Sequence, residues 1–354
     1  MKLKLKIIAL STLLSFTATA GNEDRIGSAG SAQLLINPWS RSVGWGGAGG
    51  AHIKGLGALQ LNVAGLALAD KTEIMFSRTN WMLGTGINVN SIGLAQRVGE
   101  SNVIGLSFMT MGFGDIPITT EEIPEGGIGT FSPSSFMLNI AFAKEFSSSI
   151  TGGFNLKILN EGISNASASG IAIDAGVRYV TGENDHIKFG LSLKNIGPPM
   201  KYSGDGFAIE TVNPFTEIAT TTEQRTANFE LPSLINISGA YDFIFNEKNK
   251  LTVAATFTSN SFTRDQYRAG GEYTFDATKV LVVLRVGMVY ENGLFSDDER
   301  QTALSGPSAG VSLELPFGKD RNTMGVDYSF RSGPLGGFQS VGIRLNLTKS
   351  SEED

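Results

Sequence analysis

The chain has 354 residues, no cysteine, two histidines and a formal net charge of −6. Without cysteine it can build neither a disulfide framework nor a thiolate metal site, and two histidines leave little for another transition-metal site. The acidic balance argues against a nucleic-acid partner, so we expect no nucleic acid, metal or cofactor.

The first twenty residues have the pattern of a secretory signal peptide. Lys2, Lys4 and Lys6 precede an apolar run of about twelve residues, and Ala18-Thr19-Ala20 forms an A-x-A cleavage site. A membrane-spanning helix needs about twenty apolar residues, so this run is too short for an anchor. We expect residues 1–20 to be removed and the chain to be exported through the inner membrane. No later apolar stretch reaches spanning length, so a membrane location requires a β-barrel.

Residues 21–70 are rich in glycine and precede the first predicted strand. The run from Gly44 to Gly49 matches the dinucleotide fingerprint G-x-G-x-x-G, but no strand-helix-strand unit surrounds it. We therefore favour a periplasmic or lumenal plug segment over a phosphate cradle, because glycines let backbone pack closely. The candidate plug residues are Trp39, Gly44, Trp45, Gly46, Gly47, Asn62 and Gly65.

Residues 71–348 repeat one pattern, in which apolar and polar residues alternate with the period of a β-strand. Between 187 and 194, for example, Ile, Phe, Leu and Leu alternate with Lys, Gly, Ser and Lys. Alternation alone would also fit a soluble sandwich. The predicted strands are 73–81, 88–96, 101–112, 136–145, 149–159, 168–179, 186–195, 232–243, 250–258, 265–274, 280–290, 306–315, 323–330 and 338–347.

The lengths of the connections separate the two architectures. The three longest connections all fall at odd positions in the series, so they share one end of the sheet. Outer-membrane barrels have long external loops, short periplasmic turns and an even strand number. We therefore predict an all-β, 14-stranded antiparallel transmembrane β-barrel with an N-terminal plug segment, located in the bacterial outer membrane and followed by a polar tail at 349–354.

Polar residues on the strands are expected to face the barrel lumen and to pair with each other and with the plug. Aromatic residues near strand ends fit girdles at the membrane interface, although strand propensity alone also explains them. The inward charges are Lys157, Asp174, Arg178, Lys188, Lys194, Arg268, Glu272, Arg285, Asp327 and Arg344, and the girdle candidates are Tyr179, Phe243, Tyr273, Phe275, Tyr290 and Phe330.

The two longest predicted external loops, 113–135 and 197–231, carry apolar residues among acids and threonines. Such residues are either exposed anchors for a partner or part of a cover folded over the barrel mouth. The candidate partner-binding residues are Phe207, Ile209, Val212, Phe215, Ile218, Ile116 and Ile123.

An enzymatic function finds no assembled site in the sequence. The run from Gly306 to Gly310 matches the hydrolase elbow G-x-S-x-G, but that motif needs a strand-turn-helix setting and a histidine partner. His52 is expected in the plug and His186 at a periplasmic turn, whereas Ser308 begins a strand at the external side. The acidic run 296–299 is better explained as a solvated loop than as a calcium site. We expect no catalytic residues.

Three stretches resemble the PorV/PorQ family of Bacteroidetes outer-membrane proteins. They are NPWSRSVGWGGAGGA at 37–51, NVAGLA at 62–67 and LSLKNIGPPMKYSGDG at 191–206, and residues 195–206 are most similar to the PorV members. Trp45 and Val63 stand where the family usually has Met and Pro. The resemblance implies a fatty-acid-transporter-like barrel of fourteen strands.

The same resemblance implies a role in type IX secretion. PorV-like proteins bind the C-terminal signal domains of cargo that leaves the giant translocon barrel, and they shuttle it to a surface attachment complex containing a PorU-type sortase. Outer-membrane lipid would surround the barrel. The alternative function is an outer-membrane transporter for hydrophobic small molecules, which the fold invites and which requires an apolar lumenal pocket.

Overall fold

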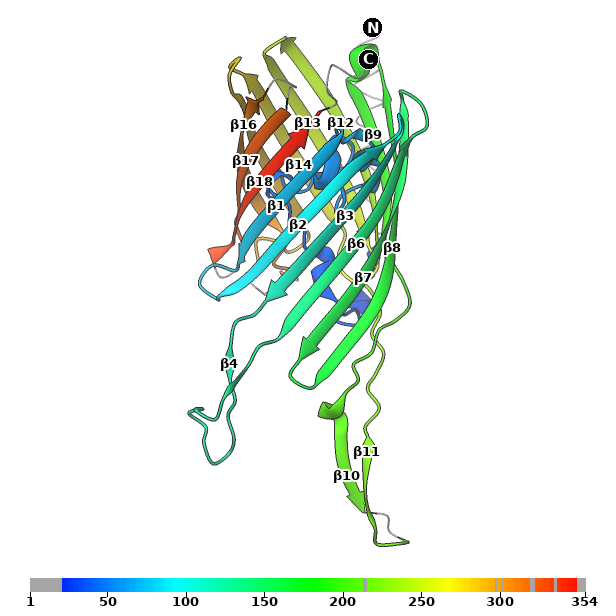
Figure 1. The fold of residues 1–354 in the computed structure, drawn as a ribbon, viewed down its shortest axis with the longest axis vertical. Coiled ribbons are helices and arrows are strands. Elements are labelled where there is room, and N and C mark those ends of the chain that lie inside the picture. The colour runs from blue at the N-terminus through cyan, green and yellow to red at the C-terminus, as the bar shows by residue number, and fades with distance from the viewer. Residues whose placement is uncertain are drawn as a thin grey trace.

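The computed structural model describes residues 21–212, 215–296, 298–300, 302–318, 322–333 and 336–348. Fourteen antiparallel strands form a closed barrel, which confirms the predicted fold (Figure 1). The barrel strands are β1 (Thr72–Trp81), β2 (Ile87–Val98), β3 (Asn102–Gly112), β6 (Ser134–Glu145), β7 (Ile150–Ile163), β8 (Ala166–Thr181), β9 (Ile187–Ile196), β12 (Leu234–Asn246), β13 (Asn249–Asn260), β14 (Gln266–Asp276), β15 (Leu281–Glu291), β16 (Gly306–Phe317), β17 (Asn322–Arg331) and β18 (Phe338–Leu347).

The barrel closes where its first and last strands pair. Thr72 lies opposite Leu347 and Asn80 lies opposite Gln339, so the backbone ladder has no free edge. The alternation predicted from the sequence sets the two faces: on β9, Phe189 and Leu191 are exposed, whereas Lys188 is buried. An apolar outside around a polar inside is the pattern of an outer-membrane β-barrel.

The strand positions match the sequence prediction to within a few residues, and the largest difference is at the connection between β7 and β8. Both strands continue further than the alternation indicated, and their ladder extends to Ile163 opposite Ala166. The connection shrinks to residues 164–165, with Ser164 in the left-handed region at φ 49°.

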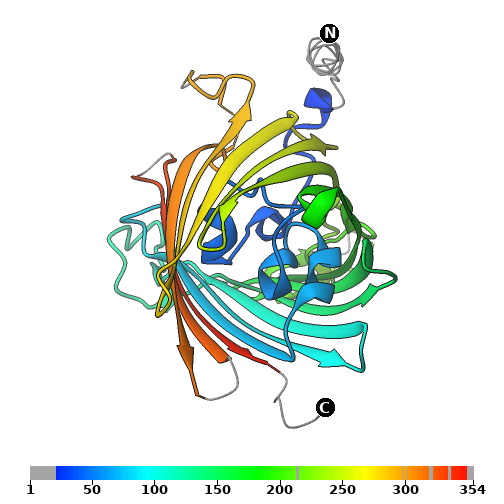
Figure 2. The same cartoon turned by 90° about the horizontal axis from the view of Figure 1, so that it is seen from above.

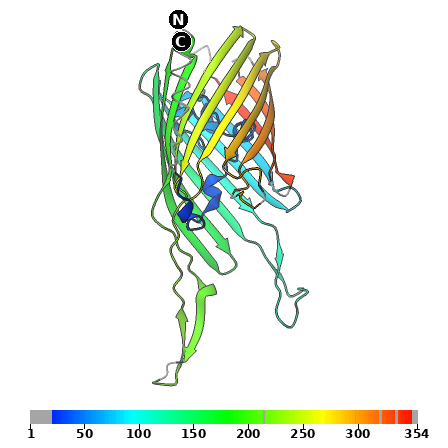
Figure 3. The ribbon, with the colours of Figure 1, turned by 180° about the vertical axis from the view of Figure 1, so that it is seen from behind.

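Two additional hairpins project from one end of the barrel, which we call the hairpin end (Figures 1 and 3). They are β4 (Ile116–Pro117) with β5 (Thr130–Phe131), and β10 (Ala208–Val212) with β11 (Ala219–Glu223). These stretches show no alternation in the sequence, which predicts them as external loops without naming the hairpins. β1 begins and β18 ends at the opposite end, which we call the terminal end.

The N-terminal segment lies inside the ring of strands (Figure 2). We call residues 31–69 the lumenal segment. Among the described residues, no helix is long and apolar enough to cross a membrane. The helical turns are η1 (Glu23–Arg25), η2 (Ala32–Leu35), α2 (Ser40–Val43), η3 (Gly55–Ala58) and η4 (Val63–Leu68), with η5 (Glu183–Asp185) and η6 (Asp205–Phe207) between barrel strands.

The hydrophobic core of the molecule forms between this segment and the inner wall. Trp39, Leu56 and Leu66 are buried in one cluster with wall residues such as Met75 and Val103. The barrel interior is therefore a packed core along this segment.

The six aromatic residues expected near the membrane interface all lie close to strand ends. Five of them are exposed, and Phe330 is half-buried. Phe330 lies on the same face of β17 as the exposed residues Met324, Val326 and Tyr328. This position fits an interface girdle. The six residues are Tyr179, Phe243, Tyr273, Phe275, Tyr290 and Phe330.

Candidate functional site

Glycines allow the lumenal segment to lie directly against the barrel wall. A Cβ on Gly44 would lie 3.1 Å from the Cα of Gly310 on β16. Gly46 and Gly47 adopt φ values of 69° and 71°, a region that favours glycine. Trp45, which separates them from Gly44, is fully buried. The GWGG run is thus a close backbone contact with the wall.

Asn62 fixes a turn of the lumenal segment at the start of η4. Its side chain accepts a hydrogen bond from the backbone N–H of Ala64 at 3.1 Å and donates to the carbonyl of Val177 at 3.0 Å. A Cβ on Gly65 would lie 2.4 Å from the Ile53 carbonyl oxygen, so only glycine fits there. The residues predicted for the plug all lie buried in the lumen: Trp39, Gly44, Trp45, Gly46, Gly47, Asn62 and Gly65.

Charged residues of the wall pair with one another, as the sequence predicted. Lys157 Nζ lies 2.7 Å from Asp174 Oδ2, and Arg285 Nε lies 2.6 Å from Glu272 Oε2. Burying these charges is tolerable because each has an opposite charge in contact.

Other wall cations hold the backbone of the lumenal segment. Arg178 Nε donates to the Ala51 carbonyl at 2.8 Å, and Lys194 Nζ donates to the Gln60 carbonyl at 2.6 Å. The expected pairing between wall and segment is therefore present as charge-assisted hydrogen bonds.

The residues of the apparent hydrolase motif do not assemble. His52 is buried with its Nε2 3.3 Å from Glu272 Oε1 and its Nδ1 3.6 Å from Asp242 Oδ1. The hydroxyl of Ser308 donates to the Gly287 carbonyl at 3.4 Å instead. Within the described ranges there is also no group of acidic or histidine residues that could hold a metal ion.

The connection from β3 to β6 forms the shorter projecting hairpin. Ile116 pairs with Phe131, and the Ile118 N–H donates to the Gly129 carbonyl at 2.9 Å. The predicted anchors Ile116 and Ile123 are exposed, and so are Ile118 and Ile128, which the prediction missed. Every isoleucine of this hairpin thus faces outward.

The connection from β9 to β12 begins with a stalk that is fastened to the barrel. Asn195 lies fully buried at its base, where its side chain accepts from Lys157 Nζ at 2.7 Å and donates to the Pro232 carbonyl at 2.9 Å. Further out, Met200 and Phe229 exchange two backbone hydrogen bonds. These contacts hold both ends of the long connection together.

A second fastening links the stalk to β7. Tyr202 donates its hydroxyl to Glu161 Oε2 at 2.6 Å, and burial together with this carboxylate raises the pKa of Tyr202 to about 12. The phenol therefore keeps its proton, and the hydrogen bond, at neutral pH. The sequence did not mark Asn195 and Tyr202 as functional residues. Their hydrogen-bond partners lie more than thirty positions away in the chain, so no local pattern reveals the contacts.

Beyond the stalk, β10 and β11 form a two-stranded ribbon, a sheet separate from the barrel that projects past the barrel strands in Figure 1. Phe215 at its tip is 94% exposed, and Ile209, Val212 and Ile218 are also exposed. Phe207 is half-buried at the base of the ribbon. The hairpin therefore projects away from the barrel mouth in Figure 1 and does not fold over it.

Both hairpin connections are acidic. Residues 113–133 contain four acids and no base, and residues 197–233 contain five acids and two bases. Exposed apolar side chains among net negative charge favour a partner with apolar pockets and basic residues.

Comparison with known proteins finds one matching family and a set of solved structures with a similar fold. The family described as "Type IX secretion system protein PorV" matches residues 19–262. A search of curated proteins found no match.

The solved structures that resemble this chain include toluene transporters and a FadL homologue. The Pseudomonas putida toluene transporter TodX has a TM-score of 0.54 and 12% identity, covering 89% of this chain and 100% of that one. A Pseudomonas aeruginosa FadL homologue has a TM-score of 0.51 and 12% identity, covering 86% and 96%. The Ralstonia pickettii toluene transporter TbuX has a TM-score of 0.51 and 13% identity, covering 88% and 97%. At these identities the likeness shows the fold.

Proposed function

Because the chain belongs to the PorV family of type IX secretion system proteins, we propose that this outer-membrane component binds the C-terminal signal domains of exported cargo. It receives them beside the giant translocon barrel and carries them to a surface attachment complex containing a PorU-type sortase. In this proposal the hairpin end faces the outside of the cell and the terminal end faces the periplasm.

The observation that carries the proposal is the free-standing ribbon of β10 and β11. An isolated two-stranded hairpin is marginally stable in water, and exposed apolar residues on it are costly unless a partner covers them. Ile209, Val212, Phe215 and Ile218 are exposed on this ribbon. The ribbon also offers two unpaired strand edges, to which an extended segment of a partner can add a strand.

The domain organisation follows from the same proposal. Residues 1–20 act as the cleaved signal peptide and lie outside the described residues, as does the polar tail 349–354. The lumenal segment acts as a plug that closes the barrel. Its wall contacts through Arg178 and Lys194 support this role.

The alternative function is transport of hydrophobic small molecules, and the fold of TodX and TbuX favours it. Transport needs an apolar path through the lumen. Here the lumenal segment packs against the wall, and the wall cations contact its carbonyls. The packed interior, in which the lumenal segment fills the space beside the wall, supports the secretion role over the transporter role.

Purification of the intact protein from detergent-solubilised outer membranes tests the proposal. Co-purification of a very large barrel protein and of cargo C-terminal domains is expected. The variant Ile209→Ser, Val212→Ser, Ile218→Ser should lose cargo capture, because it removes the exposed apolar side chains. Migration that changes on heating before electrophoresis reports that the barrel is still folded.

A matched variant changes the same ribbon without removing its apolar residues. Thr211→Ser, Thr220→Ser and Thr222→Ser keep the hydroxyl groups and should leave capture unchanged. Purification with a bound lipid but without any protein partner would contradict the proposal. Full cargo capture by the variant Ile209→Ser, Val212→Ser, Ile218→Ser would contradict it as well.

A further inference from the structure

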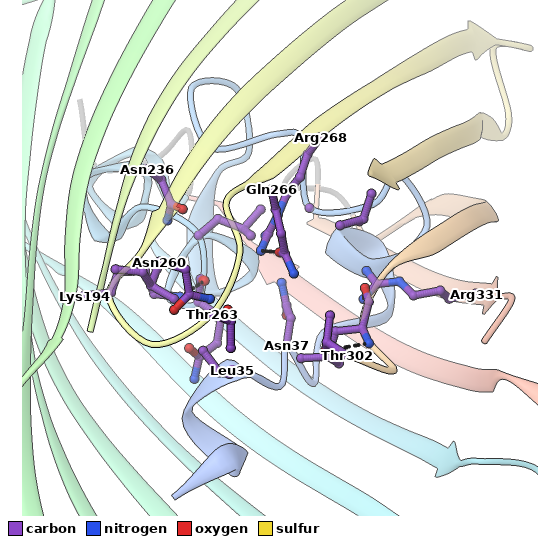
Figure 4. Close-up of a pocket in the computed structure, with 16 residues that line it drawn as sticks. Leu35, Asn37, Lys194, Asn236, Asn260, Thr263, Gln266, Arg268, Thr302 and Arg331 are labelled. Atoms are coloured by element: carbon purple, nitrogen blue, oxygen red, sulfur yellow. Dashed lines mark hydrogen bonds between the residues drawn. The ribbon is translucent and has the colours of Figure 1, made fainter. Parts of the chain in front are cut away.

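A small enclosed cavity lies between the lumenal segment and the loops of the hairpin end (Figure 4). Its volume is about 60 Å³. Three cationic side chains, Lys194, Arg268 and Arg331, line it, and none of the described residues that line it is Asp or Glu. Figure 4 shows the three cations entering from different strands around the cavity.

The hydrogen-bond acceptors of these three cations, like that of Arg178, are uncharged. Lys194 donates to the Gln60 carbonyl at 2.6 Å, Arg268 Nη2 to Gln266 Oε1 at 3.0 Å, and Arg331 Nη1 to the Leu304 carbonyl at 3.3 Å. All three acceptors are neutral. In the part of the chain that the structure describes, none of the three cations forms an ion pair within 4.0 Å.

Carboxylates near the cavity are already engaged elsewhere. Glu291 accepts hydrogen bonds from Gln266 at 3.3 Å and from Ser305 at 3.2 Å. Asp174 is paired with Lys157 at 2.7 Å, and Asp265 accepts from the Asn260 backbone at 3.3 Å. The positive charge of the cavity is therefore not balanced by contact with these acids.

Among the described residues that line the cavity, more donor atoms than acceptor atoms are buried without a partner. Arg268 Nε, Arg331 Nε and Asn37 Nδ2 are buried and have no acceptor among the described residues. The Asn37 amide is held in this orientation because its Oδ1 accepts from the Trp39 N–H at 3.1 Å. Among the described residues that line the cavity, Gln60 Oε1 is the one side-chain oxygen that is buried and accepts no hydrogen bond.

Buried cations without an opposite charge are costly, and so are buried donors without an acceptor. Both costs fall if an anion with several acceptor positions enters. A carboxylate has two oxygens that match guanidinium donors, and a cavity of about 60 Å³ admits a group of that size but not a large ligand.

We propose that this cavity is a carboxylate-binding site, in which Arg268, Arg331 and Lys194 supply the charge and Asn37 an additional donor. The carboxylate belongs either to a free small acid or to a peptide chain entering at the hairpin end. Thr263 and Thr302, which line the cavity from the connecting loops, place it toward that end. The site goes beyond the cargo role and does not depend on it.

Acetate binding to the purified full chain in detergent tests the site. At constant ionic strength, replacing chloride with acetate should raise the temperature at which the heat-dependent change in electrophoretic mobility occurs, and calorimetry should detect saturable binding. Arg268→Gln and Arg331→Gln should each weaken acetate binding about tenfold or more, because each removes a charge-assisted contact. Arg78→Gln is the matched control. Arg78 donates to Asn88 and Asn90 at an exposed position and does not line this cavity.

A short peptide with a free C-terminal carboxylate, and the same peptide as its amide, identify the source of the group. Competition with acetate by the acid but not by the amide assigns the site to a peptide. Acetate binding without peptide competition assigns it to a small free acid. Equal responses to chloride and acetate would overturn the proposal, as would acetate binding that is unchanged in both Arg→Gln variants.

The stability of the variants without acetate separates a binding role from a structural one. Removing a cation that contacts no opposite charge should leave the unfolding temperature unchanged or raise it, as is common for binding-site residues. If both arginines only stabilise the fold, both variants will unfold at lower temperature and show the wild-type acetate response, which would also overturn the proposal.

Discussion

Three side chains at the base of the long connection show how this barrel holds its projecting ribbon. Lys157 contacts both Asp174, at 2.7 Å, and Asn195, at 2.7 Å, and the Asn195 N–H donates to Asp174 at 2.8 Å. All three are buried. The group joins β7, β8 and β9 at the point where the chain leaves the barrel.

Lys157→Met should destabilise the barrel by about 3–5 kcal/mol, because it leaves Asp174 charged and buried without its cation. Urea unfolding in detergent, followed by electrophoretic mobility, measures the change. The double variant Lys157→Met, Asp174→Asn should recover most of the loss, since it removes the unpaired charge and keeps an acceptor for Asn195. A double variant as unstable as the single one would show that the charge pair is not the cause.

Gly287 gives a second test at the residue scale. A Cβ there would lie 2.2 Å from the Trp45 carbonyl carbon, so the lumenal segment must shift if Gly287→Ala is made. We expect a loss of about 1–3 kcal/mol, typical of overpacking, in the same unfolding measurement. Gly239→Ala is the control, because no heavy atom lies within 4 Å of its Cβ position. Equal losses in the two variants would mean that strand propensity, and not contact with Trp45, sets the effect.

At the scale of elements, the sequence predicted the fourteen barrel strands because each of them separates a lipid face from a lumenal face. That separation leaves a period of two in every strand, as in the alternation of β9. The β10–β11 ribbon is exposed on both faces, so no alternation marks it. The prediction therefore found its apolar residues but not its hairpin.

The sequence predicted where the lumenal segment lies, but not which turns it forms. Its short 3₁₀ turns are stabilised by distant wall residues, such as Ser192, which donates to the Leu61 carbonyl at 2.9 Å. A single sequence does not reveal contacts across more than a hundred residues. The carboxylate cavity was missed for the same reason, since Lys194, Arg268 and Arg331 come from three separate strands.

The acidic hairpins predict that partner capture depends on salt. The two connections together carry nine acids and two bases, so a partner with basic residues is attracted at long range. Raising the salt from about 0.1 M to about 1 M shortens the screening length from roughly 10 Å to 3 Å and should slow association. Surface plasmon resonance with a cargo C-terminal domain measures the association rate. Replacing Glu121, Glu122 and Glu125 with Gln should reduce this salt dependence, and an unchanged dependence would exclude a role for that loop's charge.

On the scale of the whole molecule, the barrel is wide enough to leave an internal space, and the lumenal segment occupies it. Described cavities of about 60 and 270 Å³ lie toward the hairpin end and the terminal end, and no residue lines both. The function we propose therefore takes place at the end of the barrel, where the ribbon is presented, and does not need a continuous channel.

A closed lumen predicts that the protein conducts ions poorly. In planar lipid bilayers the intact chain should give little steady conductance, because the lumenal segment contacts the wall on several sides through residues such as Arg178, Lys194 and Ser192. Urea at a concentration that leaves the barrel folded should raise the conductance reversibly. The segment's short turns have fewer internal hydrogen bonds than the closed strand ladder, so they open first. Gly287→Ala, which displaces Trp45, should lower the urea concentration needed, whereas Gly239→Ala should not. A large steady conductance of the intact chain without urea would mean that the segment does not close the barrel, and the hydrophobic transporter would then become the better account of this fold.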